Sequence, residues 1–251
     1  MKIGFLITAR LKSTRLEKKL LLKLRDREMI RWMTDRIKQS EILDQIVICT
    51  SDNIQDQPLV EIAREEGISS FCGHEDDVVE RLYEAGKYFG LDYILNITAD
   101  CPLVSVEYFD TIVSTFHEPK ADLIRCLDLP HGMYSYGIKV DALRQVMEIK
   151  DDQNTEVWGR YFTDNDQFKV TDLDIPGSHQ RPDFRLTLDY AEDFRFFEQI
   201  FDHFGGDTYK TPMDDIIQFL DDNPDIPKIN IDCKQKFQKN WDSQNKMYLK
   251  K

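Results

Sequence analysis

The sequence predicts an α/β protein with a largely parallel central sheet that helices cover on both faces. Short apolar runs typical of buried strands alternate with amphipathic stretches typical of helices, at intervals of about twenty to thirty residues. The first apolar run opens directly into polar residues, as a strand does where it leaves a sheet. The chain has no internal repeat, low-complexity stretch or glycine/serine linker, so we expect residues 1–251 to form a single domain.

The first half of the chain shows this alternation most clearly. Short apolar runs predict buried strands at residues 1–8, 44–50, 68–72 and 93–98. Amphipathic spacing between these runs predicts helices at residues 20–39, 58–67 and 76–90. Residues 10–19 form a polar and basic loop after the first strand, and Gly67 is placed to end the second helix as a C-cap.

The second half is less regular. Further strands are expected at residues 122–126, 136–140, 169–175 and 184–188. Helices are expected at residues 140–150 and 191–203, the latter rich in aromatic side chains. The tail, residues 229–251, is polar and rich in lysine, and we expect a helix there that packs against the body or against a partner subunit.

Charge and cysteine usage exclude several classes of protein. The 33 basic and 46 acidic residues give a net charge of −13, which argues against a general binder of nucleic acid or of a membrane surface. The apolar run at residues 3–9 is too short to cross a bilayer, and no signal peptide is recognisable. Five cysteines are scattered and never spaced as CxxC, which favours reduced thiols in a cytoplasmic protein.

The loop after the first strand is a candidate phosphate-binding site. Residues 9–19 (ARLKSTRLEKK) carry five cations and one anion, a local charge of +4 in an acidic chain. Ser13 and Thr14 add hydroxyls just before the predicted helix, where free backbone N–H groups favour anions. The alternative interpretation is a solvated surface turn, but ligands of open parallel sheets bind beyond the carboxyl ends of strands. The Walker, GxGxxG, HExxH, GxSxG and EF-hand patterns are all absent.

Two carboxylates are expected at strand ends on the same side of the sheet. Asp100 follows the strand at 93–98 directly, and Asp189 follows the strand at 184–188. Mg²⁺ takes one or two carboxylates and leaves its other positions to water and substrate phosphates. The alternatives are a turn cap for Asp100 and a helix N-cap region for Asp189. Two such carboxylates facing a basic loop are what metal-assisted phosphoryl or nucleotidyl transfer requires.

Four segments together resemble one protein family. Residues 9–19 resemble the signature loop of the cytidylyltransferases that activate sugar acids, the CMP-KDO and CMP-sialate synthetases. Residues 98–103 (TADCPL) are similar to the Gly-Asp-x-Pro-Leu segment of that family, and residues 188–193 (LDYAED) to its Asp-x-x-Glu-Asp stretch. Residues 73–82 (GHEDDVVERL) look most like the branch typified by spore-coat polysaccharide biosynthesis protein F. The likeness extends from Met1 to about residue 204.

The resemblance implies a fold and a set of nucleotide contacts. The fold would be a Rossmann-like three-layer α/β/α sandwich of the nucleotide-diphospho-sugar transferase type, usually dimeric, with a hairpin projecting from the second half. The loop residues that would bind the nucleotide and its triphosphate are Ala9, Arg10, Ser13, Thr14, Arg15 and Lys19. The residues that would lie near the base, the ribose or the junction with the acceptor are Ser51, Asp52, Arg81, Thr98 and Ala99.

The resemblance also implies a metal and the residues of the chemistry. Asp100 and Asp189 would hold Mg²⁺, and the catalytic residues would be Arg10, Arg15, Lys19 and Asp100. The sequence departs from the family pattern at Glu17 and Lys18, which replace Pro-Gly, at Leu20, which replaces a frequent proline, and at Ala99, which replaces a glycine. These departures remove no charged group that the chemistry needs.

The acceptor pocket is expected in the less regular half. Tyr134 and Tyr136 lie in a polar and aromatic run typical of sugar sites, although two core tyrosines in an ordinary turn are the alternative. Glu156, in a loop at 151–160, is placed to read the acceptor, and Trp158 to pack. Arg185 is a candidate partner for an acceptor carboxylate or phosphate, its alternative being a surface role on an edge strand.

The expected function is transfer of CMP from CTP to a sugar acid or a related phosphorylated or carboxylated acceptor, with release of pyrophosphate. Residues 1–115 would form the nucleotide-binding half and residues 116–228 the acceptor-binding and dimerisation half of a cytoplasmic homodimer. The alternatives are a guanylyl- or other nucleotidyltransferase acting on a sugar 1-phosphate, a GT-A glycosyltransferase and a non-catalytic nucleotide-binding homologue. Asp76-Asp77 disfavours the glycosyltransferase, because that class uses a DxD motif.

Overall fold

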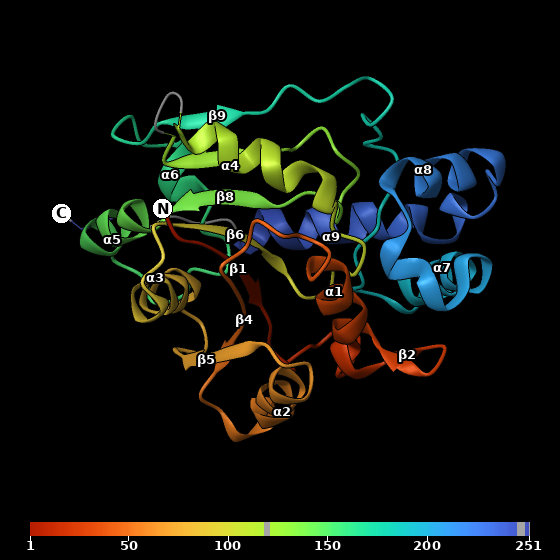
Figure 1. Cartoon of the computed structure of the whole chain (residues 1–251), viewed down its shortest axis with the longest axis horizontal. Helices are drawn as coiled ribbons and strands as arrows, with labels where there is room; N and C mark the ends of the chain where they lie inside the picture. Colours follow the sequence, from red (N-terminus) through yellow and green to blue (C-terminus); the bar gives the residue numbers. More distant parts are fainter. Residues whose placement is uncertain (118–120, 245–248, 251) are drawn as a thin grey trace.

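A single mixed sheet is the centre of the computed structural model, which describes residues 1–117, 121–244 and 249–250. Its seven strands run in the order β5-β4-β1-β6-β8-β7-β9 (Figure 1). They are β1 (Ile3–Thr8), β4 (Gln45–Ser51), β5 (Ser69–Gly73), β6 (Tyr93–Thr98), β7 (Leu123–Arg125), β8 (Tyr136–Lys139) and β9 (Val170–Asp172). Within this sheet, as far as the chain is described, the β6–β8 and β7–β8 pairs are antiparallel and the other four are parallel, so the largely parallel sheet is confirmed.

Helices cover both faces of this sheet, because side chains alternate between the faces along each strand. In β1, Phe5 and Ile7 point to one apolar core and Leu6 to the other. The helices of the first core are α1 (Met29–Ile37), α2 (Gln57–Glu65), α4 (Phe109–His117), α7 (Ala191–Phe204) and α8 (Met213–Asp222). Those of the second are α3 (Val78–Phe89), α5 (Val140–Ile149) and α6 (Arg160–Thr163). The three-layer α/β/α sandwich is therefore confirmed.

The helix predicted at residues 20–39 is wrong in its first half. A short 3-10 turn and a hairpin of β2 (Lys23–Leu24) and β3 (Arg27–Glu28) precede α1. The backbone turns at Arg25, whose φ of 53° lies in the left-handed region that a helix cannot use. Leu20 and Leu24 are buried, so their apolar spacing looked helical. The two-stranded hairpin that the structure shows is thus in the first half, and the described residues of the second half form no separate two-stranded sheet.

The strand predicted at residues 184–188 is also wrong. Within that segment only Arg185 makes a β-bridge, to His131. The N–H of Leu186 donates to the carbonyl of His131 at 2.6 Å, and the N–H of Leu188 to the carbonyl of Asp100 at 2.9 Å. Its alternating apolar residues Phe184, Leu186 and Leu188 are buried in the first core without a strand ladder. The strand β9 is shorter than the predicted 169–175.

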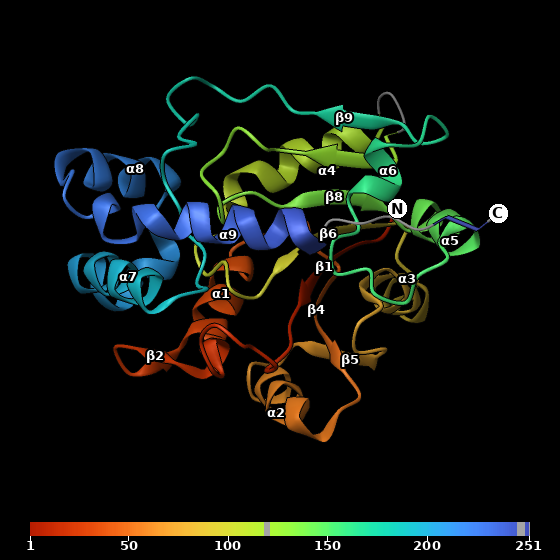
Figure 2. The same cartoon turned by 180° about the vertical axis from the view of Figure 1, so that it is seen from behind.

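The tail forms a long helix, α9 (Ile231–Gln244), that lies on the body of the chain. Cys233 is fully buried, and Asn230 just before the helix donates to the carbonyl of Arg185 at 3.0 Å. Figures 1 and 2 show α9 extending from the α7–α8 region along the sheet. The short 3-10 helices are η1 (Lys19–Leu21), η2 (Ile54–Asp56), η3 (Val106–Tyr108), η4 (Gly205–Lys210) and η5 (Pro227–Asn230). Among the described residues, none of the helices has the length and apolar character needed to span a bilayer.

Candidate active site

A cavity of about 360 Å³ opens beyond the carboxyl ends of β1 and β6. Thr8 and Thr98, the last residues of these two strands, lie in its wall. Nine residues expected at the site line it: Arg10, Ser13, Thr14, Arg15, Lys19, Thr98, Ala99, Asp100 and Glu156. The structure therefore brings the basic loop, a strand-end carboxylate and the 151–160 loop to one place, as ligand sites of parallel sheets require.

Backbone contacts to a buried carboxylate fix the course of the basic loop. Asp56 is fully buried at the end of η2 and accepts a hydrogen bond from the N–H of Leu11 at 2.7 Å. Its other oxygen accepts from the hydroxyl of Ser51. Ala9 continues the β1–β4 ladder by donating to the carbonyl of Cys49 at 3.0 Å. The sequence indicated only a polar turn at Asp56, because its partner lies 45 residues away.

Lys19 joins the two carboxylates that were expected to bind metal. Its Nζ lies 2.5 Å from Oδ2 of Asp100 and 2.8 Å from Oδ1 of Asp189. Arg15 adds a second cation, with Nη2 at 2.5 Å from the same oxygen of Asp189. Burial alone would lower the pKa of Lys19, but the two carboxylates outweigh it and raise this pKa to about 12. The ammonium is therefore charged at any ordinary pH.

Asp189 is itself held by a buried cluster at the start of α7. Arg185 is 3% exposed, and its Nη2 lies 2.7 Å from Oδ2 of Asp189. Asp193 accepts the N–H groups of Asp189 and Tyr190, at 2.9 and 3.0 Å, and pairs with Arg185 at 3.1 Å. Burial would raise the pKa of Asp189, but Lys19, Arg15 and Arg185 hold it well below its usual range. Arg185, expected to meet the acceptor, pairs with Asp189 and Asp193 and does not line the cavity.

The donor set at Asp100 and Asp189 fits Mg²⁺. Two carboxylate oxygens that share one ammonium group already surround a cation position, and Mg²⁺ needs no more protein ligands when phosphates supply the rest. Across the described ranges no group of three or more His, Cys, Asp or Glu residues is arranged for a metal. A divalent ion at this site would therefore depend on substrate oxygens.

Arg10 and Lys12 are also paired with acidic side chains. Nη1 of Arg10 donates to Oδ1 of Asp76 and to the carbonyl of Glu75, both at 2.8 Å, and Nη2 lies 3.3 Å from Oε1 of Glu156. Lys12 lies 3.0 Å from Glu75. Arg10 thus connects the basic loop to the start of α3 and to the 151–160 loop. Asp76 lines the cavity, although the sequence analysis considered it only as part of the Asp76-Asp77 pair that does not form a DxD motif.

Ser51, Asp52 and Arg81, expected near the base or ribose, do not line the cavity. Ser51 is buried against Asp56, and Asp52 is exposed. Arg81 is fully buried, and its Nη1 donates to the carbonyls of His74 and Glu75, the second at 2.9 Å. Burial lowers the pKa of this guanidinium. Since Arg10 binds the same carbonyl of Glu75, Arg81 lies directly behind the cavity wall.

A series of three aromatic rings runs inward from the cavity wall. Trp158 lines the cavity, Tyr136 packs edge-on against it with ring centroids 5.1 Å apart, and Tyr134 lies 5.6 Å further on. Burial raises the pKa of both tyrosines. The two tyrosines therefore lie behind Trp158 and do not line the cavity themselves. Trp158, expected only to pack, is the aromatic residue that a ligand would meet.

The side chain of His131, near this site, makes the stability of the fold sensitive to acid. Burial, with the nearby charge of Arg185, lowers the pKa of His131 from 6.5 to about 4. Between these two pH values the unfolded chain binds more protons at His131 than the folded chain. Stability from this group is therefore complete above pH 6.5 and is lost as the pH falls toward 4.

We expect His131→Gln to reduce the acid dependence of unfolding by roughly 1–3 kcal/mol between pH 6.5 and pH 4. Urea unfolding of both proteins across this range measures the difference. Parallel curves for the two proteins would contradict the assignment.

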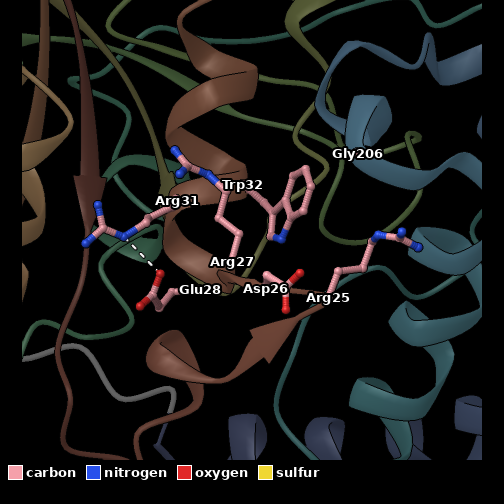
Figure 3. Close-up of a pocket in the computed structure, with 7 residues that line it drawn as sticks. All are labelled: Arg25, Asp26, Arg27, Glu28, Arg31, Trp32 and Gly206. Atoms are coloured by element: carbon pink, nitrogen blue, oxygen red, sulfur yellow. Dashed lines mark ion pairs between the residues drawn. The ribbon is translucent and has the colours of Figure 1, made fainter.

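A second cavity, of about 470 Å³, lies away from the carboxylates and the basic loop. Figure 3 shows that it lies between the β2–β3 hairpin, Trp32 of α1 and Gly206 of η4. Its arginines are engaged with acidic neighbours, among them Arg31 with Glu28 at 2.9 Å. None of the expected site residues lines it, so we place the chemistry at the smaller cavity.

The match to a family model decides what kind of protein this is. Residues 5–246 match the family model described as Cytidylyltransferase. The chain belongs to this cytidylyltransferase family. Members of the family are nucleotidyltransferases, so the resemblance seen in the sequence motifs is confirmed.

Individual relatives of this cytidylyltransferase family member extend the likeness over nearly the whole chain. An uncharacterized protein of Methanocaldococcus jannaschii, MJ1063, is 35% identical over 238 residues, which cover 94% of this chain and 97% of that protein. Spore coat polysaccharide biosynthesis protein SpsF of Bacillus subtilis is 27% identical over 230 residues, which cover 89% of this chain and 95% of that protein. A solved cytidylyltransferase from Leptospira borgpetersenii is 26% identical, with a TM-score of 0.81 over 90% of this chain and 96% of that one.

Proposed function

We propose that this cytidylyltransferase transfers CMP from CTP to a sugar acid or a related phosphorylated or carboxylated acceptor, in the formation of surface polysaccharide precursors. The observation that carries the proposal is a cavity lined by the basic loop and Asp100, in which Lys19 and Arg15 also contact the buried carboxylate of Asp189 directly behind the lining. Family membership supports the cytidylyl group, and the relative SpsF supports polysaccharide synthesis. An acceptor oxygen would bond to the α-phosphorus of CTP while the bond to the bridging oxygen breaks and pyrophosphate leaves.

The loop residues would bind the triphosphate. Arg10, Arg15 and Lys19 supply positive charge, and Ser13 and Thr14 supply hydroxyl donors along the same wall. These fixed cations would stabilise the charge that develops on the leaving pyrophosphate, and electrostatic stabilisation of this kind usually contributes most to the rate enhancement. Binding requires Lys19 and Arg15 to exchange their carboxylate partners for phosphate oxygens.

Asp100 and Asp189 would hold Mg²⁺ in this proposal. When bound there, Mg²⁺ supplies a Lewis acid that lowers the pKa of an acceptor hydroxyl and neutralises phosphate charge. Arg185 and Asp193 would keep the Asp189 carboxylate oriented toward the cavity. Thr98, whose hydroxyl donates to Asp100 at 2.5 Å, would do the same for the second carboxylate.

Residues 1–115 would supply the nucleotide contacts and residues 116–228 the acceptor contacts. Glu156 and Trp158 line the cavity beside Arg10 of the basic loop, and carboxylate and aromatic side chains are suited to a sugar ring. The homodimer and the cytoplasmic location stay predictions from the sequence.

Thermal unfolding with CTP, GTP, UTP and ATP, each with and without Mg²⁺, tests the proposed nucleotide. CTP with Mg²⁺ at a hundredfold over its Kd is expected to stabilise the fold by about 2.7 kcal/mol. Release of pyrophosphate is then measured with a panel of 2-keto sugar acids and sugar 1-phosphates.

Lys19→Met is expected to abolish the rise in melting temperature that CTP causes. Lys18→Met is its matched control, because Lys18 is exposed and does not line the cavity. The proposal would be contradicted if only another triphosphate raised the melting temperature. It would also be contradicted if both variants lost the effect of CTP equally.

A further inference from the structure

A buried ion pair lies outside the site described above. The side chain of Asp77, at the N-cap of α3, is fully buried, and that of Lys150, just after α5, is 7% exposed. Nζ of Lys150 contacts Oδ2 of Asp77 and donates to the carbonyl of Asp152 at 3.0 Å. Charged groups are costly to bury, and well-packed apolar residues are often at least as stable. Fold stability therefore does not explain why this ion pair is buried.

Thr155 extends this pair into a fixed attachment for the 151–159 loop. Its fully buried hydroxyl donates to Oδ1 of Asp77 at 2.8 Å and accepts from the N–H of Val79 at 2.9 Å. The N–H of Thr155 donates to the carbonyl of Asp76 at 3.1 Å. The loop is thus bonded to the start of α3 through both its backbone and its side chains.

The attachment ends one residue before the cavity. Glu156 follows Thr155 directly, and its carboxylate lies 3.3 Å from Arg10. Asp76 and Asp77 are neighbours with opposite contacts: Asp76 pairs with Arg10 at the cavity, and Asp77 with Lys150 behind it. Trp158 of the same loop forms the aromatic wall. A shift of the loop would therefore move Glu156 and Trp158 together.

We propose that Asp77, Lys150 and Thr155 are positioning residues that hold the 151–159 loop so that Glu156 and Trp158 form the acceptor-side wall of the cavity. The proposal deepens the proposed function and rests on it only for the identity of what meets this wall. Because this wall would contact the acceptor, a displaced loop is expected to weaken acceptor binding more than nucleotide binding.

The C-terminal end of α5, with its C-cap residue Lys150, is also held through its backbone. Residues 249–250 return to the same place, where Leu249 makes an antiparallel bridge to Lys150 and the N–H of Lys250 donates to the carbonyl of Ile149 at 2.8 Å. Lys150 is therefore fixed from its backbone as well as from its side chain. This leaves the loop after it as the element whose position the ion pair determines.

Hydrogen exchange tests the attachment without any substrate. Lys150→Met removes the ion pair with Asp77, and Thr155→Val removes both hydrogen bonds of the Thr155 hydroxyl. Arg144→Met removes a surface cation of α5 as a matched control. We expect exchange of residues 151–159 to become at least about tenfold faster in the first two proteins, with β1 and β6 unchanged, as in local opening. Unchanged exchange in the loop, or uniformly faster exchange in the Thr155→Val protein, would overturn the proposal.

A kinetic cycle tests whether the attachment acts through Glu156. With the acceptor of the panel that gives the fastest pyrophosphate release, Lys150→Met is expected to raise the acceptor KM about tenfold and to leave the CTP KM within about twofold. The same change in a Glu156→Gln background is expected to add little, because residues acting through one another are not additive. Fully additive effects, or a fall in kcat with both KM values unchanged, would refute the assignment. If the wild-type protein is inactive with every acceptor, the proposed function fails and hydrogen exchange alone decides the positioning role.

Discussion

Asp100→Asn is expected to lower pyrophosphate release by at least about a thousandfold while the protein stays folded. Asparagine keeps the shape of the side chain and can still accept the hydroxyl of Thr98. It removes one of the two carboxylates at the cation position shared with Lys19 and leaves the charge of the incoming phosphates less well neutralised. Turnover is measured by pyrophosphate release, and folding by thermal unfolding.

The matched control is Asp92→Asn, at the opposite end of β6. Asp92 is exposed and accepts the N–H of Lys2, well away from the cavity lining. Its turnover should equal that of the unaltered protein. Wild-type-like pyrophosphate release in the Asp100 variant would remove Asp100 from the catalytic residues and with it the metal assignment.

Asp189→Asn is expected to have the largest effect on stability, about 3–5 kcal/mol in urea unfolding. The Asp189 carboxylate is 2% exposed and contacts three cations, Arg15, Lys19 and Arg185. Removing its charge leaves these groups short of a partner in a largely buried cluster. Pyrophosphate should then raise the melting temperature of this variant more than that of the unaltered protein, because it restores negative charge to the same cations.

Asp183→Asn is the control for this result. Asp183 is exposed and pairs with Arg181 at 2.7 Å, a surface contact worth at most about 1 kcal/mol. Equal losses of stability in the two variants, or no preferential rescue by pyrophosphate, would mean that Asp189 does not neutralise the cluster.

Local patterns predicted most of the sheet and the residues at its edge. The strand at residues 93–98 is observed with the same bounds, because a short apolar run between Gly90 and Asp100 leaves little choice of ends. Arg10, Lys19 and Asp100 were placed by the rule that ligands bind beyond parallel strand ends, and the cavity lies there. Asp189 was placed beside Asp100 on the basis of a predicted strand that the structure does not contain. The hydrogen bond from the N–H of Leu188 to the carbonyl of Asp100 brings Asp189 there instead.

Contacts between residues far apart in the chain could not be predicted from local sequence patterns. The pair of Asp77 and Lys150 joins residues 73 positions apart, and Asn230 reaches Asp193 from the tail, 37 positions away. No periodicity or spacing relates such residues, since their approach depends on how whole helices pack. The β2–β3 hairpin was missed for a different reason: Leu20 and Leu24 satisfy both helical spacing and burial beneath a turn.

The paired state of the cavity cations has a consequence for the speed of encounter with the nucleotide. The four cationic side chains in the described lining, Arg10, Lys12, Arg15 and Lys19, each have a carboxylate within 3.3 Å. The cavity therefore projects little positive potential into solvent, and the chain as a whole carries a charge of −13. A free triphosphate approaches against this field, so salt that screens the repulsion should speed its arrival. Strong attraction begins only inside the cavity, when phosphate oxygens replace the carboxylates one contact at a time.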